Sequence, residues 1–402
     1  MATPFGPPPG SDRLLVVFGD IEMGAGGLGD DFPHDDFLID VLEAYNKPPF
    51  DQVAVDIVFN GDTFDFLKTS IDHKYPRHIT EDIALGKAKR VLAAHEQFCN
   101  GLGRFLDFEG AARNAYFIVG NHDLELVFAA VRQTIATQIG RPRQVHFPGF
   151  RLVVGNCHIE HGNQQDTMFA VDESQLLINY EGKPIINLPW GTVALLDVAM
   201  PLQPYLFVLD RMKPRNRVFE LLPQIKALVV NEYWRYWTMD FLADAIYGDP
   251  VKQPSWTLFR EVIYRLGSFN LNVLPNDDFQ QAITTNDDIH VYVMGHLHQA
   301  GWFGYGDRKV LVTGCFRNEY MMAQNGDVLR TIPKVYGEVY LGGDKVLRSH
   351  LVEVQPPPEA KDLAPRSIFE VVGRVGPIPV DPELLQAAEA QAELEAKKAK
   401  DD

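Results

Sequence analysis

Short apolar runs that each end in a polar loop mark the first third of the chain. The runs Leu14–Phe18, Val55–Phe59 and Ala115–Val119 are rich in branched and aromatic side chains, which predicts buried strands. Residues 80–108 carry spaced apolar side chains after an acidic start, and residues 123–139 repeat this helical pattern. The alternation of strands and helices predicts an α/β domain built in layers.

Extended segments resume in the second half of the chain and predict further strands. They lie at Arg151–Val154, Cys157–Glu160, Ile289–Met294, Lys309–Thr313 and Val335–Leu341.

The stretch between these two groups of strands breaks the rhythm and suggests a division into parts. We expect a core formed by residues 13–166 and 289–356, with residues 167–288 inserted as a mainly helical cap. The Pro- and Gly-rich residues 1–12 are expected to be disordered. Residues 357–402 form a C-terminal extension with an acidic tail.

Composition narrows the class of protein. A formal net charge of −17 argues against stable nucleic-acid binding, because phosphate backbones favour proteins with clustered Lys and Arg. The three cysteines, Cys99, Cys157 and Cys315, form no CxxC pair, which fits a reducing compartment. There is no secretory signal pattern, and the longest apolar stretch is interrupted by Asp197 and prolines. We therefore expect a cytoplasmic protein without a transmembrane helix.

Polar side chains suited to metal binding follow five of the predicted strands. Taken singly, each short motif is weak, because Gly-Asp and Gly-Asn pairs are common in turns. Together they bring carboxylate, amide and imidazole groups to neighbouring strand ends, which are the donors that divalent metals use. These residues are Asp20, Glu22, Asp62, Asp65, Asn121, His122, Asp123, His161, His296 and His298.

The motifs GDIE, GDTFD, GNHD, EHGN and GHLH, in this order from Gly19 to His298, resemble the signature of calcineurin-like metallophosphoesterases. The resemblance implies a four-layered α/β/β/α sandwich with a centre of two divalent ions. We expect these ions to be Mn²⁺ or Fe, with Mg²⁺ or Zn²⁺ as the alternatives. It also implies a ligand set. Asp20 and His298 would bind the first metal, Asn121, His161 and His296 the second, and Asp62 would bridge the two.

The same resemblance implies an activity. The protein would hydrolyse a phosphomonoester, a phosphodiester or a pyrophosphate by attack of a metal-bound hydroxide. His122 would stay free of metal and protonate the leaving group, and Asp123 would orient the imidazole of His122. Asp65 is expected to hold the loop or a neighbouring imidazole and not to bind metal.

Glu22 departs from the family pattern, which has a histidine at this position of the first motif. A carboxylate there is a harder ligand, so it would favour Mn²⁺, Fe²⁺ or Mg²⁺. The alternative is that Glu22 forms a salt bridge and binds no metal. A function of another class follows from that alternative: a non-catalytic protein that binds a phospholigand or acts as a scaffold, with a degraded first metal site.

Two further features bear on the substrate. Arg317 could contact a substrate phosphate or form a structural salt bridge. The predicted cap combines aromatic and basic residues, and EHGNQQD is similar to UDP-diacylglucosamine pyrophosphohydrolases, so a lid over a lipid-like or nucleotide-like phosphoester, or peripheral membrane contact, is one hypothesis. The other is that the aromatics form the cap's own core. The aromatic residues of the predicted cap are Tyr233, Trp234, Tyr236 and Trp237, and its basic residues are Arg211, Lys213, Arg215 and Arg217.

Overall fold

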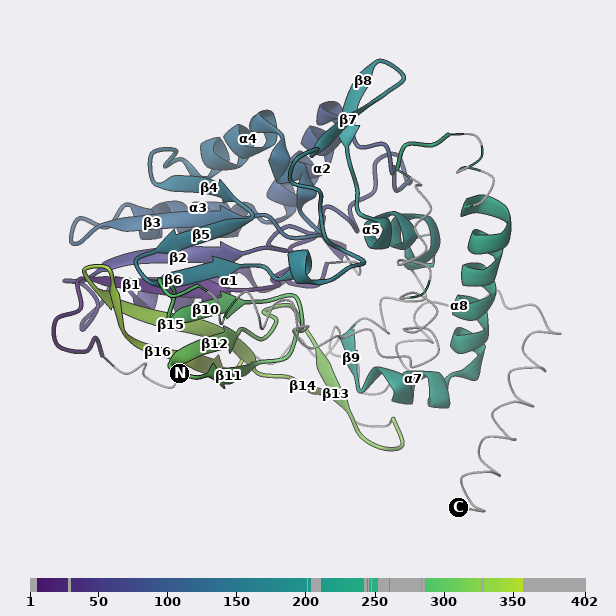
Figure 1. The fold of residues 1–402 in the computed structure, drawn as a ribbon. Helices are drawn as coiled ribbons and strands as arrows, with labels where there is room; N and C mark the ends of the chain where they lie inside the picture. Colours follow the sequence, from purple (N-terminus) through teal and green to yellow (C-terminus); the bar gives the residue numbers. More distant parts are fainter. Residues whose placement is uncertain are drawn as a thin grey trace. The chain divides into compact units, whose positions relative to one another are not determined.

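The chain folds into two compact units. The first comprises Met1–Thr192, Trp256–Arg317 and Pro333–Pro356, and the second comprises Val193–Ser255, Asn318–Ile332 and Pro357–Asp402. The structure, a computed structural model (Figure 1), describes residues 6–27, 30–200, 202–203, 211–241, 244, 246, 248–251, 260, 283, 286–326 and 329–356. The predicted tail at 357–402 and residues 1–5 of the predicted disordered segment lie outside these residues.

A six-stranded sheet of the first unit carries the first three predicted strands at its centre. Strands β1 to β4 run parallel, whereas β15 pairs antiparallel with β1 and β16 antiparallel with β15. The order across the sheet is β16-β15-β1-β2-β3-β4. The bounds are β1 Arg13–Phe18, β2 Ala54–Asn60, β3 Arg113–Ile118, β4 Val145–Gly149, β15 Lys334–Gly342 and β16 Lys345–Val354.

A five-stranded sheet of the same unit has the order β11-β12-β10-β6-β5. Its central strands β6, β10 and β12 are parallel, and the two edge strands are antiparallel to their neighbours. The bounds are β5 Arg151–Val154, β6 Cys157–Glu160, β10 Val291–Met294, β11 Gly301–Tyr305 and β12 Arg308–Val312.

The two sheets share one apolar core. Val17 of β1 and Val58 of β2 belong to the same buried cluster as Ile159 of β6 and Val293 of β10. Because successive side chains of a strand point to opposite faces, the next residue, Phe59, faces the other way and contacts Phe98 of a helix. The six-stranded sheet therefore lies between the second sheet and a layer of helices (Figure 1).

The helices of that layer are α1 Asp35–Ala44, α2 Glu81–Ala94, α3 Glu96–Leu106 and α4 Ala129–Ile139. A short 3₁₀ turn, η2 Leu124–Val127, precedes α4, and another, η3 Asn163–Gln165, follows β6. The described residues of the first unit thus form three layers: one of helices and two of sheet. The fourth layer of the predicted sandwich stays a prediction.

The prediction of an α/β domain is confirmed, and each predicted strand matches an observed one to within two residues at either end. The predicted helix at 80–108 is two helices, because His95 ends α2 and precedes α3 with backbone angles outside the helical region. Within the two large sheets and the helix layer, the pattern analysis missed α1, β4, β11 and β16. The strands β4, β11 and β16 lie at or next to sheet edges, where part of each strand faces water and the apolar signal is weak.

The remaining elements are short. In the first unit, β7 Leu177–Tyr180 and β8 Lys183–Ile186 form a hairpin, and α5 Trp190–Ala194 runs from the first unit into the second. Among its described residues, the second unit has the sheet β14-β13-β9, two helices and two π-helical turns. Their bounds are β9 Met212–Lys213, β13 Tyr320–Met322, β14 Leu329–Thr331, α7 Arg215–Leu221, α8 Pro223–Arg235, η4 Leu195–Ala199 and η5 Tyr236–Phe241.

In the second unit, Met212 and Tyr320 of this sheet pack with Val218 and Ile225 of α7 and α8. The predicted cap at 167–288 stays a prediction, since many of its residues are not described. Among the described residues, no helix is both long and apolar enough to cross a membrane.

The ion pairs of His95 make stability depend on pH. The His95 ring contacts Asp35 through Nδ1 at 2.7 Å and Asp30 through Nε2 at 2.9 Å. Burial alone would lower the pKa of His95, but the two carboxylates outweigh it and raise this pKa from 6.5 to about 9. A raised folded-state pKa stabilises the fold fully below the unfolded value and no longer does so once the pH has passed the folded value.

We therefore expect the free energy of unfolding in urea to fall by roughly 3 kcal/mol at most between pH 6 and pH 9.5 through this group. His95→Gln should be less stable at pH 6 and should lose most of that pH dependence. Equal slopes for the two proteins would contradict the assignment.

Candidate metal centre

The predicted site residues lie at the carboxyl ends of parallel strands from both sheets. In an α/β fold these ends share one edge, where loops can present polar groups to a ligand. Asp20 follows β1, Asp62 follows β2, Asn121 and His122 follow β3, His161 follows β6, and His296 and His298 follow β10.

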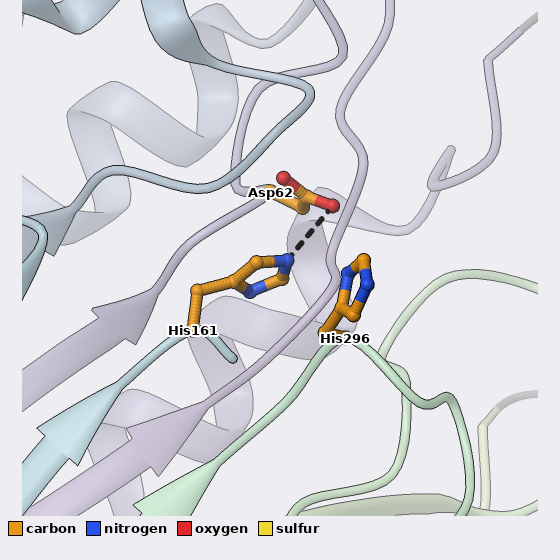
Figure 2. A group of neighbouring side chains, drawn as sticks. All are labelled: Asp62, His161 and His296. Carbon is orange, nitrogen blue, oxygen red and sulfur yellow. Dashed lines mark ion pairs between the residues drawn. The ribbon is translucent and has the colours of Figure 1, made fainter. Parts of the chain in front are cut away.

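One cluster of potential metal ligands joins the two sheets. Asp62, His161 and His296 each offer a ligand atom, and these atoms lie within 4.8 Å of one another (Figure 2). The closest printed pair is Asp62 Oδ2 and His161 Nε2, at 3.1 Å. Asp62 and His161 are buried, and His296 is partly exposed.

A second cluster, formed by Asp20, Glu22 and His298, has the same compactness. His298 Nε2 lies 3.2 Å from Asp20 Oδ1 and 3.5 Å from Glu22 Oε1. Asp20 Oδ1 is also 3.9 Å from His161 Nε2 of the first cluster. The two clusters are therefore neighbours, and the structure brings together six of the predicted ligands, including Glu22.

The donor atoms of these clusters fit divalent cations. The ring of His161 makes a 2.9 Å hydrogen bond through Nδ1 to the carbonyl of Asn60, so in the neutral imidazole the lone pair is on Nε2 and faces Asp62 Oδ2. Two acceptors at this distance require a proton or a cation between them. Within the described residues, Asp20 Oδ1, Glu22 Oε1 and Asn121 Oδ1 are buried without a hydrogen-bond partner. Such oxygen and imidazole donors suit Mn²⁺, Fe²⁺ and Zn²⁺.

The electrostatic field of the site favours positive charge. Burial alone would lower the pKa of His161, but Asp62 and Asp20 outweigh it and raise the pKa to about 9. The pKa of His298 is likewise raised well above its usual value against burial and Arg317, chiefly by Asp20. Burial opposes the ionisation of Asp62, but His161 and His122 lower its pKa. The carboxylates therefore stabilise a cation at this place, whether it is an imidazolium or a metal.

The backbone at the site adopts an unusual conformation. Asp20, Glu22, Asp62, His296 and His298 all have positive φ, between 48° and 65°. In the described part of the chain only three other non-glycine residues do so. Such angles disfavour side chains with a Cβ and are typically maintained where function requires them.

Glu22 uses its two oxygens differently. Oε1 faces His298, whereas Oε2 accepts hydrogen bonds from Lys68 at 2.9 Å and from Arg317 at 2.8 Å. Burial alone would raise the pKa of Glu22, but Arg317 and Lys68 outweigh it and lower this pKa well below its usual range. One oxygen of Glu22 therefore points to the candidate metal cluster, and the other forms salt bridges.

Arg317 lies against Glu22 and also 3.4 Å from Asp31, and its side chain is only 1% exposed. This geometry favours the salt-bridge alternative over contact with a substrate phosphate.

His122 is oriented by a different acid from the one predicted. Its Nδ1 lies 3.1 Å from Asp65 Oδ1. The carboxylate of Asp123 accepts the backbone N–H groups of Gly120 at 2.6 Å and Thr63 at 2.9 Å, and burial raises its pKa to about 7. Asp123 thus holds two loops together, and the expected role of Asp65 in holding a neighbouring imidazole matches the geometry.

Some residues at the site escaped the sequence analysis. Lys68 and Asp31 contact each other, and Asp166 Oδ2 lies 3.3 Å from His296 Nε2. Asp166 ends the EHGNQQD motif and Lys68 follows Asp65 by three residues, so proximity to a motif was the available signal. Asp31 lies in a loop with no such signal.

Comparisons with known proteins add little. No family model matches the chain, and no curated protein matches it. Solved structures that resemble it include a Staphylococcus aureus protein described as a candidate 5'-nucleotidase (12% identity, TM-score 0.32, 95% of this chain and 58% of that one). Another is the phosphopantetheinyl hydrolase of Mycobacterium tuberculosis, with 12% identity and a TM-score of 0.25 over 76% of this chain and 91% of that one. A third is the sulfate thiohydrolase SoxB of Thermus thermophilus, with 8% identity and a TM-score of 0.30 over 98% of this chain and 62% of that one.

Gly61 provides a test of the tight packing beneath the site. It has a φ of +73°, and a Cβ on it would lie 2.4 Å from Cγ of His161. Gly140 is a matched control, because its φ is +80° and nothing lies within 4 Å of its Cβ position. We expect Gly140→Ala to cost about 1–2 kcal/mol of unfolding free energy and Gly61→Ala roughly 1–3 kcal/mol more. Urea unfolding of both variants measures the difference, and equal losses would show that the site tolerates a displaced His161.

Proposed function

We propose that this chain is a metal-dependent hydrolase of phosphate esters. The observation that supports this most is the pair of neighbouring clusters with buried acceptor atoms that face one another, beside a histidine held by a carboxylate. Each cluster alone could be a chance grouping of acids and histidines. The two together, with five residues at positive φ, are expensive to build and call for a ligand of positive charge.

The proposed ligand set follows the clusters. Asp20, Glu22 and His298 would hold the first cation, and Asn121, His161 and His296 the second. Asp62 would bridge the two with Oδ2, because its Oδ1 accepts the backbone N–H of His122 at 2.7 Å. The first position offers two carboxylates and one imidazole, so we expect it to favour Mn²⁺, Fe²⁺ or Mg²⁺.

The chain's own groups supply the rest of the chemistry. Bound divalent cations would lower the pKa of a water and offset the charge of the phosphoryl oxygens. His122 is held through Nδ1 by Asp65, which leaves Nε2 to carry the proton for the leaving-group oxygen. Burial opposes the protonation of His122, but Asp62, Glu22 and Asp65 raise its pKa to about 10. Cations beside it would lower this value towards neutrality, the range in which a general acid is most effective.

The proposed substrate is a small phosphoester. The hypothesis that the predicted cap forms a lid over this substrate depends on its basic and aromatic residues. Within that unit Lys213 pairs with Glu319 at 2.7 Å, and Arg217 pairs with Glu220. Tyr236 is buried against Phe241. The buried contact of Tyr236 with Phe241 favours the alternative in which the aromatics form the cap's own core. Trp234 is 51% exposed, so an apolar contact with a lipid-like substrate remains a hypothesis for this residue.

The metal content of the purified chain is the first test. We expect two metal ions per chain and Mn²⁺-dependent hydrolysis of p-nitrophenyl phosphate or its bis-ester. Chelation should remove the metal ions and abolish the hydrolysis. Glu22→His should keep activity and shift the metal preference towards Zn²⁺, because imidazole is the softer ligand. A wild-type chain that binds no metal, with activity only in Glu22→His, would instead indicate the non-catalytic alternative.

The role of His122 is tested by its removal. We expect His122→Ala to lower kcat roughly 100- to 10,000-fold for an alkyl phosphate ester, which needs protonation of its leaving group. The loss should be much smaller for p-nitrophenyl phosphate, and the metal content should not change. His146→Ala is the matched control, because His146 stacks on Tyr116 at the far strand β4. Equal losses for both esters would contradict the role of His122 as an acid.

A further inference from the structure

Three carboxylates at the second cluster, the one formed by Asp20, Glu22 and His298, share one lysine. The side chains of Glu22, Asp31 and Asp65 are at most 2% exposed. Buried carboxylates are costly unless cations or hydrogen-bond donors compensate them. Lys68, with a side chain 9% exposed, lies among all three, and Arg317 contacts two of them.

The ammonium of Lys68 makes three close contacts. Its Nζ lies 2.9 Å from Glu22 Oε2, 2.5 Å from Asp31 Oδ2 and 3.1 Å from Asp65 Oδ2. Each contact is on a different carboxylate, and each uses a separate oxygen. This arrangement around a single positive charge is similar to the coordination of a small cation by carboxylates.

The same place has the composition of a metal site. Glu22, Asp65 and His122 offer ligand atoms that lie within 4.8 Å of one another, as compact as in the two clusters described above. Asp31 adds a further carboxylate oxygen next to them. A cation bound here would have His122 Nδ1 within reach, because this atom lies 3.9 Å from Glu22 Oε2 and 3.1 Å from Asp65 Oδ1.

We infer that the ammonium of Lys68 occupies a third cation position and thereby keeps metal ions away from His122. The inference rests on the proposed function, which assigns two metal positions and a metal-free His122. Lys68 is a positioning residue in this account. It fixes Oε2 of Glu22, so that only Oε1 is left for the first metal, and it fixes Asp65, which holds His122.

The experiment counts bound ions. We expect Lys68→Met to bind one more Mn²⁺ per chain than the wild type, measured by elemental analysis after dialysis and by calorimetric titration. Removal of the ammonium leaves carboxylate oxygens and His122 Nδ1 that a divalent ion can share. Lys68→Gln, which keeps a hydrogen-bond donor for Glu22, is measured in parallel and should also gain an ion. The extra ion should be absent from the double variant Lys68→Met with His122→Ala.

Two controls separate this effect from the loss of a buried charge. Lys68→Arg keeps the positive charge and should bind the wild-type number of ions. Lys87→Met removes another buried lysine, whose Nζ pairs with Glu125 at 2.7 Å, and should gain no ion because a single carboxylate is left. The melting temperature of Lys68→Met should also rise on addition of Mn²⁺ at concentrations that already saturate the wild type.

The outcomes distinguish the two proposals. If the Met and Gln variants bind the same number of ions as the wild type with the same affinity, Lys68 does not occupy a metal position and the inference is overturned. A wild-type chain that binds no metal and has no activity would overturn the proposed function itself.

Discussion

The burial of negative charge at the strand ends is the constraint on which the rest of the site depends. A buried carboxylate is costly without a compensating cation or donor. Six carboxylates at this edge of the first unit are at most 2% exposed: Asp20, Glu22, Asp31, Asp62, Asp65 and Asp123. The chain compensates them in three ways, with the fixed cations Lys68 and Arg317, with the imidazoles of His161 and His298, and with backbone N–H groups on Asp123.

These three kinds of partner differ in whether a metal ion can replace them. Lysine, arginine and backbone donors are permanent partners, so the carboxylate oxygens that they hold are structural. An imidazole can release its proton and become a ligand, so the acids facing His161 and His298 can exchange an imidazolium for a metal ion. The division between fixed and exchangeable partners separates the scaffold from the candidate metal positions. Glu22 belongs to both groups, with one oxygen in each.

The backbone conformation at the site is also energetically unfavourable. Five of the six residues that form the two clusters have positive φ angles. Gly61 and Gly120 lie so close to His161 and Asp62 that no Cβ fits. The packing of the two sheets through Val17, Val58, Ile159 and Val293 maintains this geometry, because it fixes the strand ends from which the loops start. The apolar core between the sheets thus determines the spacing of polar groups more than 100 residues apart in the chain.

The sequence by itself determined the α/β class, the central strands and the strand-end positions of the metal-type residues. The local signals were sufficient there: apolar runs of strand length, each followed by glycine and a polar motif. The tertiary structure decided what no local pattern contains. It determined that Asp65 and not Asp123 contacts His122, that Arg317 pairs with Glu22, and that Lys68 lies among three carboxylates. These contacts join residues from different loops, and only the packing of the strands that carry the loops determines which charges meet.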